Sequence, residues 1–303
     1  MSEKILAVVT GPTASGKTAL AIALAQHYNT EIVSADSRQL FADLPIGTAA
    51  PTAEERRLAR HHLCGVLPLD AYYSASRFEE DALPILDAIW TQHPVAIVCG
   101  GSMMYVDTLI RGIDDMPTIT DATRKYVLEL LENHGLNGVL AQLEICDPDY
   151  YAIVDKNNTR RVVHALEVSL QAGVPYSTLR TGQSKKRPFK VVEMAIDMPR
   201  EQLFSRISAR VEAMFDAGLE KEARRAFAQG DFNALNTVGY KELHPYFAGL
   251  VSLEDTKAKI ARNTRVYAKK QITWLRRNPN IHWLNPETAT DEAISLIDKA
   301  IME

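Results

Sequence analysis

The feature that most constrains this chain is the segment Gly11-Pro-Thr-Ala-Ser-Gly-Lys-Thr18 near the N-terminus. It matches the pattern GxxxxGK[ST] completely. It follows a short apolar run at residues 5–9 and precedes an alanine- and leucine-rich segment at residues 18–28. A buried strand, a glycine-rich loop and a helix in this order form a concavity in which backbone amides bind phosphate oxygens. The sequence therefore predicts a phosphate-binding loop between a strand and a helix.

The residue types of this loop suit a bound diphosphate. The glycines let the backbone curl so that its amides face inward, Lys17 adds a positive charge, and the Thr18 hydroxyl is a ligand for Mg²⁺. We take the whole loop as the predicted diphosphate site, namely Gly11, Pro12, Thr13, Ala14, Ser15, Gly16, Lys17 and Thr18. The pattern predicts that phosphates are bound, and it leaves open whether a phosphoryl group is transferred.

Other short apolar runs predict the rest of a sheet. They lie at residues 31–34, 94–99 and 191–196, and residues 281–284 add a last candidate strand. Strands that alternate with helical segments are typical of an α/β fold with a parallel sheet. We therefore expect a P-loop NTPase-like core, with a parallel sheet and helices on both faces.

The pattern changes near Gly112. Residues 121–172 are helical in pattern, and a polar, basic stretch leads back to the strand at residues 191–196. We expect a helical insertion domain at residues 113–187 between two parts of the core, residues 1–112 and 188–303. The second part of the core is predicted to be mostly helical after that strand.

Composition excludes several classes of protein. Among 303 residues the formal net charge is −4, so only local basic clusters could mark a nucleic-acid surface. The three cysteines form no CxxC pair, which argues against a zinc site or a disulfide framework. No apolar stretch approaches membrane-spanning length. A cytoplasmic protein without a membrane partner is expected.

Further segments resemble the tRNA dimethylallyltransferase family, also called tRNA isopentenyltransferases. With the phosphate loop, the segments in question are Asp36-Ser-Arg-Gln-Leu-Phe41, Ile46-Gly-Thr-Ala49, Gly100-Gly-Ser-Met-Met-Tyr105, Arg160-Arg161 before Ala165-Leu-Glu-Val168, Gly239-Tyr-Lys-Glu242 and Tyr267-Ala-Lys-Lys-Gln-Ile-Thr-Trp-Leu275. Their order and spacing carry the resemblance. The chain ends without the Cys/His zinc extension of eukaryotic members, so a bacterial-type member is expected.

The resemblance implies a reaction. Such enzymes transfer a dimethylallyl group from dimethylallyl diphosphate to the exocyclic N6 amine of the adenosine 3′ to the anticodon, in tRNAs that read codons beginning with U. The expected partners are the donor and the tRNA anticodon stem-loop, the expected cofactor is Mg²⁺, and family members usually act as monomers. The phosphate loop would then hold a leaving group and cut no phosphoanhydride.

The resemblance also implies catalytic roles. An adenine amine needs a base placed next to it, and Asp36 is implied in that role. Its alternative is an outer-sphere ligand of Mg²⁺, because the strand at 94–99 ends in glycines and lacks the metal-binding acid of phosphoryl-transferring enzymes. Lys17 and Ser102 complete the predicted catalytic set. Arg206 and Arg210, four residues apart on one helix face, are candidates to bind the diphosphate.

A tRNA surface is predicted from basic residues. Every charged residue from Lys257 to Arg277 is basic, and Arg262, Lys269 and Arg276 recur at heptad spacing. Basic groups at 156–161 and 185–187 fall in the expected insertion. Of two aromatics at the same spacing, Tyr267 and Trp274, the second is expected in the core. The predicted tRNA contacts are Asp36, Ser37, Arg38, Gln39, Ser102, Arg124, Arg160, Arg161, Lys241, Arg262, Arg265, Lys269 and Arg276.

Three departures from the family pattern bear on tRNA binding rather than on the reaction class: Ala50 where lysine is common, Asn158 where aspartate is common, and His164 where arginine is frequent. A fourth, Ser102 where threonine is usual, keeps a hydroxyl near the base or the donor and loses a methyl group. Three alternatives stay open: an enzyme that prenylates free adenine nucleotides, a P-loop small-molecule kinase, and a paralogue that binds tRNA without catalysis. The basic helix favours tRNA over a free nucleotide as the acceptor.

Overall fold

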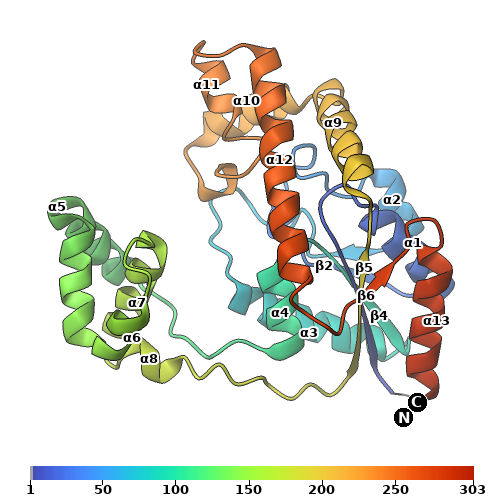
Figure 1. Ribbon diagram of the computed structural model, residues 1–303, viewed down its shortest axis with the longest axis horizontal. Coiled ribbons are helices and arrows are strands. Elements are labelled where there is room, and N and C mark those ends of the chain that lie inside the picture. The colour runs from blue at the N-terminus through green and yellow to red at the C-terminus, as the bar shows by residue number, and fades with distance from the viewer. Residues whose placement is uncertain (1–2) are drawn as a thin grey trace. The chain divides into compact units, whose positions relative to one another are not determined.

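The computed structural model describes residues 3–303, which form two compact units, residues 3–111 with 186–303 and residues 112–185. The larger unit contains a six-stranded parallel sheet in the described residues, with strand order β3-β2-β4-β1-β5-β6 (Figure 1). Its strands are β1 (Ile5–Thr10), β2 (Ile32–Ser34), β3 (His61–His62), β4 (Val95–Cys99), β5 (Lys190–Ile196) and β6 (His282–Leu284). The predicted α/β fold is confirmed.

Helices and one 3-10 turn complete this unit. Before the insertion they are α1 (Lys17–His27), α2 (Ala53–Leu58), α3 (Ala75–Trp90) and α4 (Met103–Arg111). After it they are α9 (Arg200–Asp216), α10 (Leu219–Gln229), η1 (Asn233–Leu235), α11 (Leu243–Phe247), α12 (Leu253–Leu275) and α13 (Ala289–Met302). None of the helices in the described part of the chain is long and apolar enough to cross a membrane.

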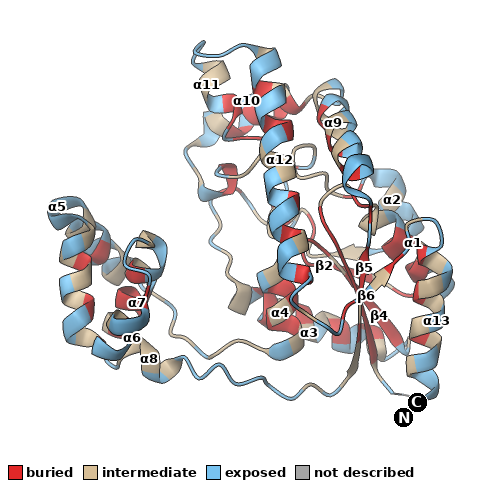
Figure 2. Cartoon of the chain, in the orientation of Figure 1, coloured by how far each residue is buried: buried red, intermediate tan, exposed pale blue. Residues whose placement is uncertain are grey.

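Strand β1 lies at the centre of the sheet, and all its residues are buried (Figure 2). Ile5, Ala7 and Val9 pack on one face with apolar residues of α1 and α13. Leu6 and Val8 pack on the other face with residues of α3 and α4. A strand covered on both faces has no polar side, so its sequence is continuously apolar rather than alternating.

Residues 112–185 form the second unit. Its helices are α5 (Asp121–Cys146, with a break in helical geometry at Gly135), α6 (Pro148–Ile153), α7 (Thr159–Ala172) and α8 (Tyr176–Leu179). They enclose a separate apolar core that includes Val139, Leu143 and Leu166. These limits fall one residue before the expected start and two residues before the expected end.

The end of the predicted insertion needs a correction at Arg187. This residue lies in the larger unit, where its side chain donates to Glu79 Oε1 (2.5 Å) and to the Thr108 carbonyl (2.8 Å). Both charged side chains are about nine-tenths buried. The side chain of Arg187 therefore belongs to the interior of the larger unit and not to an exposed basic cluster of the insertion. Strand β3, too short to show an apolar pattern, was also not predicted.

Candidate active site

The carboxyl ends of β1, β2 and β4 bring three loops together, which is where ligands bind in parallel sheets. The Ala35 N–H donates to the Cys99 carbonyl (2.9 Å), and the Ser102 N–H donates to the Ala35 carbonyl (3.1 Å). Gly100 makes this approach possible, because a Cβ atom there would lie 2.1 Å from the Ala35 oxygen. The family-like glycine block thus joins the turn that carries Asp36.

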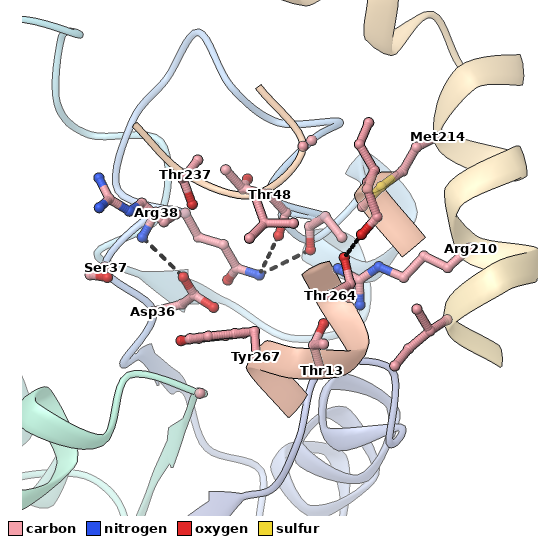
Figure 3. A pocket seen from close by; sticks show the side chains of 18 of the residues that line it. Thr13, Asp36, Ser37, Arg38, Thr48, Arg210, Met214, Thr237, Thr264 and Tyr267 are labelled. Atoms are coloured by element: carbon pink, nitrogen blue, oxygen red, sulfur yellow. Dashed lines mark hydrogen bonds between the residues drawn. The ribbon is translucent and has the colours of Figure 1, made fainter. Parts of the chain in front are cut away.

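A cleft of about 370 Å³ opens at these strand ends (Figure 3). It is formed by the phosphate loop, the turn after β2, the loop before α2, the loop around residue 238, and one face each of α9 and α12. Its lining includes Thr13, Lys17, Thr18, Asp36, Ser37, Arg38, Gln39, Thr48, Cys99, Arg210, Met214, Thr237, Lys241, Thr264, Tyr267 and Gln271. Residues far apart in the sequence therefore share one cavity.

The phosphate loop has the expected curled shape. The Ser15 N–H donates to the Pro12 carbonyl (3.3 Å), and Lys17 Nζ donates to the same oxygen (2.8 Å). Gly16, at φ 101°, leads into α1. Burial lowers the pKa of Lys17, and the charge of Arg210 lowers it further, while Cys99 and Asp36 oppose the shift. A bound anion would stabilise the charged lysine in this desolvated position.

Helix α9 brings both predicted arginines to the loop. Arg210 lines the cleft, where burial lowers its pKa and the charge of Asp36 opposes that shift. Arg206 Nη1 lies 3.5 Å from the Ser15 carbonyl oxygen. The spacing of four residues thus places two cations on the face that borders the loop. Their role in binding the diphosphate remains a prediction.

Asp36 lines the cleft, and Figure 3 shows it next to Tyr267 of α12. Its Oδ1 accepts a hydrogen bond from the Arg38 N–H (2.9 Å), which orients the carboxylate. Tyr267 of α12 also lines the cleft, and burial, followed by the charge of Asp36, raises the pKa of its phenol to about 12. A neutral phenol is a hydrogen-bond donor, so this residue offers one beside the proposed base.

Ser102 acts on the same turn from outside the cleft lining. Its hydroxyl accepts from the Ser37 N–H (2.8 Å) and donates to the Ser37 hydroxyl (3.1 Å). These contacts keep the function that the family's threonine hydroxyl could supply. They place Ser102 as a support for Ser37, next to Asp36, rather than as a group that lines the cavity.

Gln271 belongs to a family-like segment, Tyr267–Leu275, in which the sequence indicates no role for it. It is 2 % exposed and lies in α12, where its Oε1 accepts from the Thr13 N–H (2.9 Å) and its Nε2 donates to the Gly101 carbonyl (2.9 Å). One side chain thus fastens the phosphate loop to the glycine block. A polar residue at a buried position of an amphipathic helix was the signal that could have revealed it.

The basic segment lies in and just after α12, and acids of other elements form ion pairs with some of its residues. Lys257 pairs with Glu212 (2.6 Å), and Arg276 pairs with Asp197 (2.7 Å). Arg265 donates to Ser208 Oγ (2.7 Å). Arg262 and Lys269 are exposed. Glu254 and Asp255 also lie in the first turn of α12. The absence of acids from Lys257 to Arg277 is therefore a weaker sign of a phosphate-binding face than the sequence indicated.

Trp274, expected in the core, is 37 % exposed and lines a small cavity behind Gln271. Tyr267, at the same spacing, lines the main cleft instead. Seven-residue spacing put both aromatics on the inner side of α12, but the helix passes over two different cavities. Core packing of Trp274 is therefore wrong.

Within the insertion, Arg160 and Arg161 are exposed at the N-terminal end of α7. The guanidinium of Arg124 lies 4.0 Å from the Glu167 carboxylate. His164 packs its ring against Tyr176, with 5.8 Å between ring centroids. Arg160 and Arg161 therefore present positive charge at the surface of this unit, whereas burial lowers the pKa of His164. Contact of these residues with tRNA remains a prediction.

Known proteins resemble the chain along nearly its whole length. The sequence model of the IPP transferase family matches residues 39–278. The tRNA dimethylallyltransferase 1 of Bacteroides thetaiotaomicron is 46 % identical over 286 residues, which cover 94 % of this chain and 93 % of that protein. The protein of the same name from Bacteroides fragilis is 44 % identical over 287 residues, or 95 % of each chain.

Solved structures agree with these relatives. The tRNA delta(2)-isopentenylpyrophosphate transferase of Staphylococcus epidermidis superposes with a TM-score of 0.70 at 33 % identity, over 98 % of this chain and 100 % of that one. A eukaryotic dimethylallyltransferase acting on tRNA gives a TM-score of 0.83 at 26 % identity, over 99 % and 79 %. The chain belongs to the IPP transferase family.

Proposed function

We propose that this protein transfers a dimethylallyl group from dimethylallyl diphosphate to the N6 amine of the adenosine 3′ to the anticodon, in tRNAs that read codons beginning with U. One observation carries the proposal: Asp36 and the phosphate loop share a single cleft with Arg210 and Tyr267. A base and a site for the leaving group are thereby placed within one cavity. The names of the relatives support the prenyl donor and tRNA acceptor.

In the proposed step, the adenine nitrogen attacks C1 of the allylic donor as the bond from C1 to the diphosphate oxygen breaks. Asp36 takes the proton of the attacking amine. The diphosphate leaves with its negative charge on oxygen, and Lys17, Arg210 and the loop amides stabilise that charge. Burial of these cations strengthens their attraction for the leaving group, because the surrounding dielectric is low.

The cleft suits a divalent cation bound mainly through substrate phosphates. The Thr18 hydroxyl and the Asp36 carboxylate both line it, and the described residues contain no group of three acidic, histidine or cysteine side chains that could hold a metal alone. Mg²⁺ commonly binds in this way, through one or two protein oxygens, water and phosphate. When bound, it would neutralise charge on the diphosphate.

The target adenine lies in a stacked anticodon loop, so it must be flipped out to enter the cleft. Lys241 and Gln39 line the cleft and are suited to contact the nucleotide there. Arg262 and Lys269, exposed on α12, are suited to bind phosphates of the tRNA backbone. Arg160 and Arg161 of the insertion are proposed to bind the stem-loop as well.

The test is transfer of labelled dimethylallyl from its diphosphate to unmodified bacterial tRNA with Mg²⁺, with AMP as the competing acceptor. We expect label at the adenosine 3′ to the anticodon. Label in AMP alone would contradict the proposal and indicate an enzyme of free nucleotides. Label in neither acceptor, together with turnover of ATP, would indicate a kinase.

A further inference from the structure

Glu222 is a buried acid that the proposed reaction does not use. It lies in the first turn of α10 and is 1 % exposed. Its two oxygens accept hydrogen bonds from the N–H groups of Ile46 and Gly47 (2.9 Å each) and from the hydroxyl of Tyr240 (2.5 Å). A buried carboxylate is costly unless its oxygens are hydrogen-bonded, so this group of donors is what makes the position tolerable.

Tyr240 makes the contact specific. It is fully buried, and burial, followed by the charge of Glu222, strongly raises the pKa of its phenol, which therefore stays protonated and donates. The ring lies so close to Gly47 that a Cβ atom there would be 2.4 Å from Cζ of the ring. Residues 44–50 and residues 236–241, which we call the loop pair, are thus locked together through one carboxylate.

The loop pair faces the cleft. Gly47, Thr48 and Ala49 line it from one loop, and Thr237 and Lys241 from the other (Figure 3). On the far side of the first loop, Glu222 holds backbone amides. On its inner side, the side chain of Gln39 donates to the Ala49 carbonyl (2.9 Å). Gln39 belongs to the same turn as Asp36, so the loop and the proposed base are connected through that turn.

A second buried acid fixes the other loop. Glu242 is 2 % exposed, and it accepts from the Gly239 N–H (2.8 Å) and from Asn263 Nδ2 of α12 (2.7 Å). The phosphate loop has a separate support in Gln271, which contacts neither Glu222 nor Tyr240. Different buried side chains therefore hold the two regions: Gln271 holds the phosphate loop, and Glu222 and Glu242 hold the loop pair.

We propose that Glu222 is a positioning residue for the acceptor: through Ile46, Gly47 and Tyr240 it sets the loop pair that receives the flipped nucleobase. This inference rests on the proposed function. The donor site depends on the phosphate loop and is not affected by Glu222. A substitution of Glu222 should therefore weaken tRNA binding and leave diphosphate binding unchanged.

Two variants test this role. Glu222→Gln keeps the size of the side chain but turns an NH₂ group toward donors, and Tyr240→Phe removes one of the three hydrogen bonds. The control is Glu220→Gln, two residues earlier on α10, where Glu220 pairs with Arg224 (2.9 Å) at the surface. We expect the KM for tRNA to rise roughly tenfold or more in Glu222→Gln and less in Tyr240→Phe. The KM for the donor and the Kd for inorganic pyrophosphate should stay within about twofold of the wild-type values.

Amide hydrogen exchange gives a readout that does not depend on activity. In Glu222→Gln, exchange at Ile46 and Gly47 should accelerate by roughly tenfold or more, while amides of the phosphate loop and the control variant remain as in the wild type. Unchanged exchange at both amides would overturn the proposal. An equal loss of donor and tRNA binding would also overturn it, because that pattern belongs to general destabilisation. A wild-type protein without transfer would contradict the proposed function and leave the exchange result to decide the role of Glu222.

Discussion

The two sides of the cleft are built in different ways. The phosphate side combines a loop that is continuous in sequence with Arg210 of α9, and both Lys17 of the loop and Arg210 line the cleft. The loop pair is assembled from distant segments; its Lys241 lines the cleft, and two buried acids outside the pair, Glu222 and Glu242, hold its backbone. The phosphate side uses its charges to bind, whereas these two acids hold the backbone of the loop pair in place.

This difference follows from the two ligands. A diphosphate is small and highly charged, so a short loop of amides with a lysine recognises it directly. A nucleobase is flat and nearly neutral, so it needs a surface of defined shape. Buried carboxylates that accept from backbone N–H groups fix such a shape without presenting charge to the base. Substitutions can therefore separate donor effects from acceptor effects.

The largest effect on the rate of transfer should come from substitution of Asp36. Asp36→Ala should lower transfer by about 10³-fold, because none of the other described residues that line the cleft is a carboxylate, while tRNA binding stays nearly intact. Single-turnover transfer and filter binding of tRNA measure the two quantities. Transfer at the full rate would show that the base is assigned to the wrong residue.

Substitution on the phosphate side should affect the donor alone. Lys17→Ala should lower kcat/KM for dimethylallyl diphosphate by roughly 10²-fold, since a desolvated cation at the leaving group is lost. The Kd for tRNA, measured without donor, should not change. A comparable loss of tRNA affinity would break the distinction between the two sides.

Substitution on the loop-pair side should first affect stability. Gly47→Ala places a methyl group against the Tyr240 ring, and overpacking of this kind costs about 1–3 kcal/mol of unfolding free energy. The same substitution in a Tyr240→Leu background should cost less, because the opposing ring is gone. Denaturant unfolding of all four proteins measures this coupling, and strictly additive costs would contradict it.

The pH dependence of donor binding should follow the lysine. Burial lowers the pKa of Lys17 below the ordinary value of 10.5, so its charge is lost at a lower pH than that of an exposed lysine. Pyrophosphate affinity should fall with that loss. Calorimetry across alkaline pH should show the fall in the wild type and in Tyr267→Phe, since that phenol titrates at about 12, and should not show it in Lys17→Arg.

The smallest effect is expected on the surface of α12. Arg262→Ala should weaken tRNA binding several-fold and reduce the slope of log Kd against log salt by about one. Arg276→Ala should do less, because Arg276 is already paired with Asp197. Equal effects of the two substitutions would show that this ion pair opens when tRNA binds.

Sequence reasoning identified residues of the phosphate loop and Asp36, which the structure brings to one cleft, but it missed the buried acids that hold the loop pair. The loop pattern and the apolar strand before it are local signals, and Asp36 follows the next strand directly. Glu222 carries no such signal, because its partners are amides 175 and 176 residues away. The placement of Arg187 in the insertion was wrong for the same reason, because only the folded chain shows that it forms a buried ion pair with Glu79. Long-range burial of charge is invisible in local spacing.

The contact of Arg187 with the Thr108 carbonyl has a consequence for how this protein is put together. Thr108 lies four residues before the insertion begins, and Arg187 lies two residues after it ends. The chain therefore leaves and re-enters the core at points fastened to one another. This contact joins the two ends of the core within the larger unit, so the core does not need the insertion to hold them together. Replacing residues 112–185 by a short flexible linker should yield a folded core that still binds pyrophosphate.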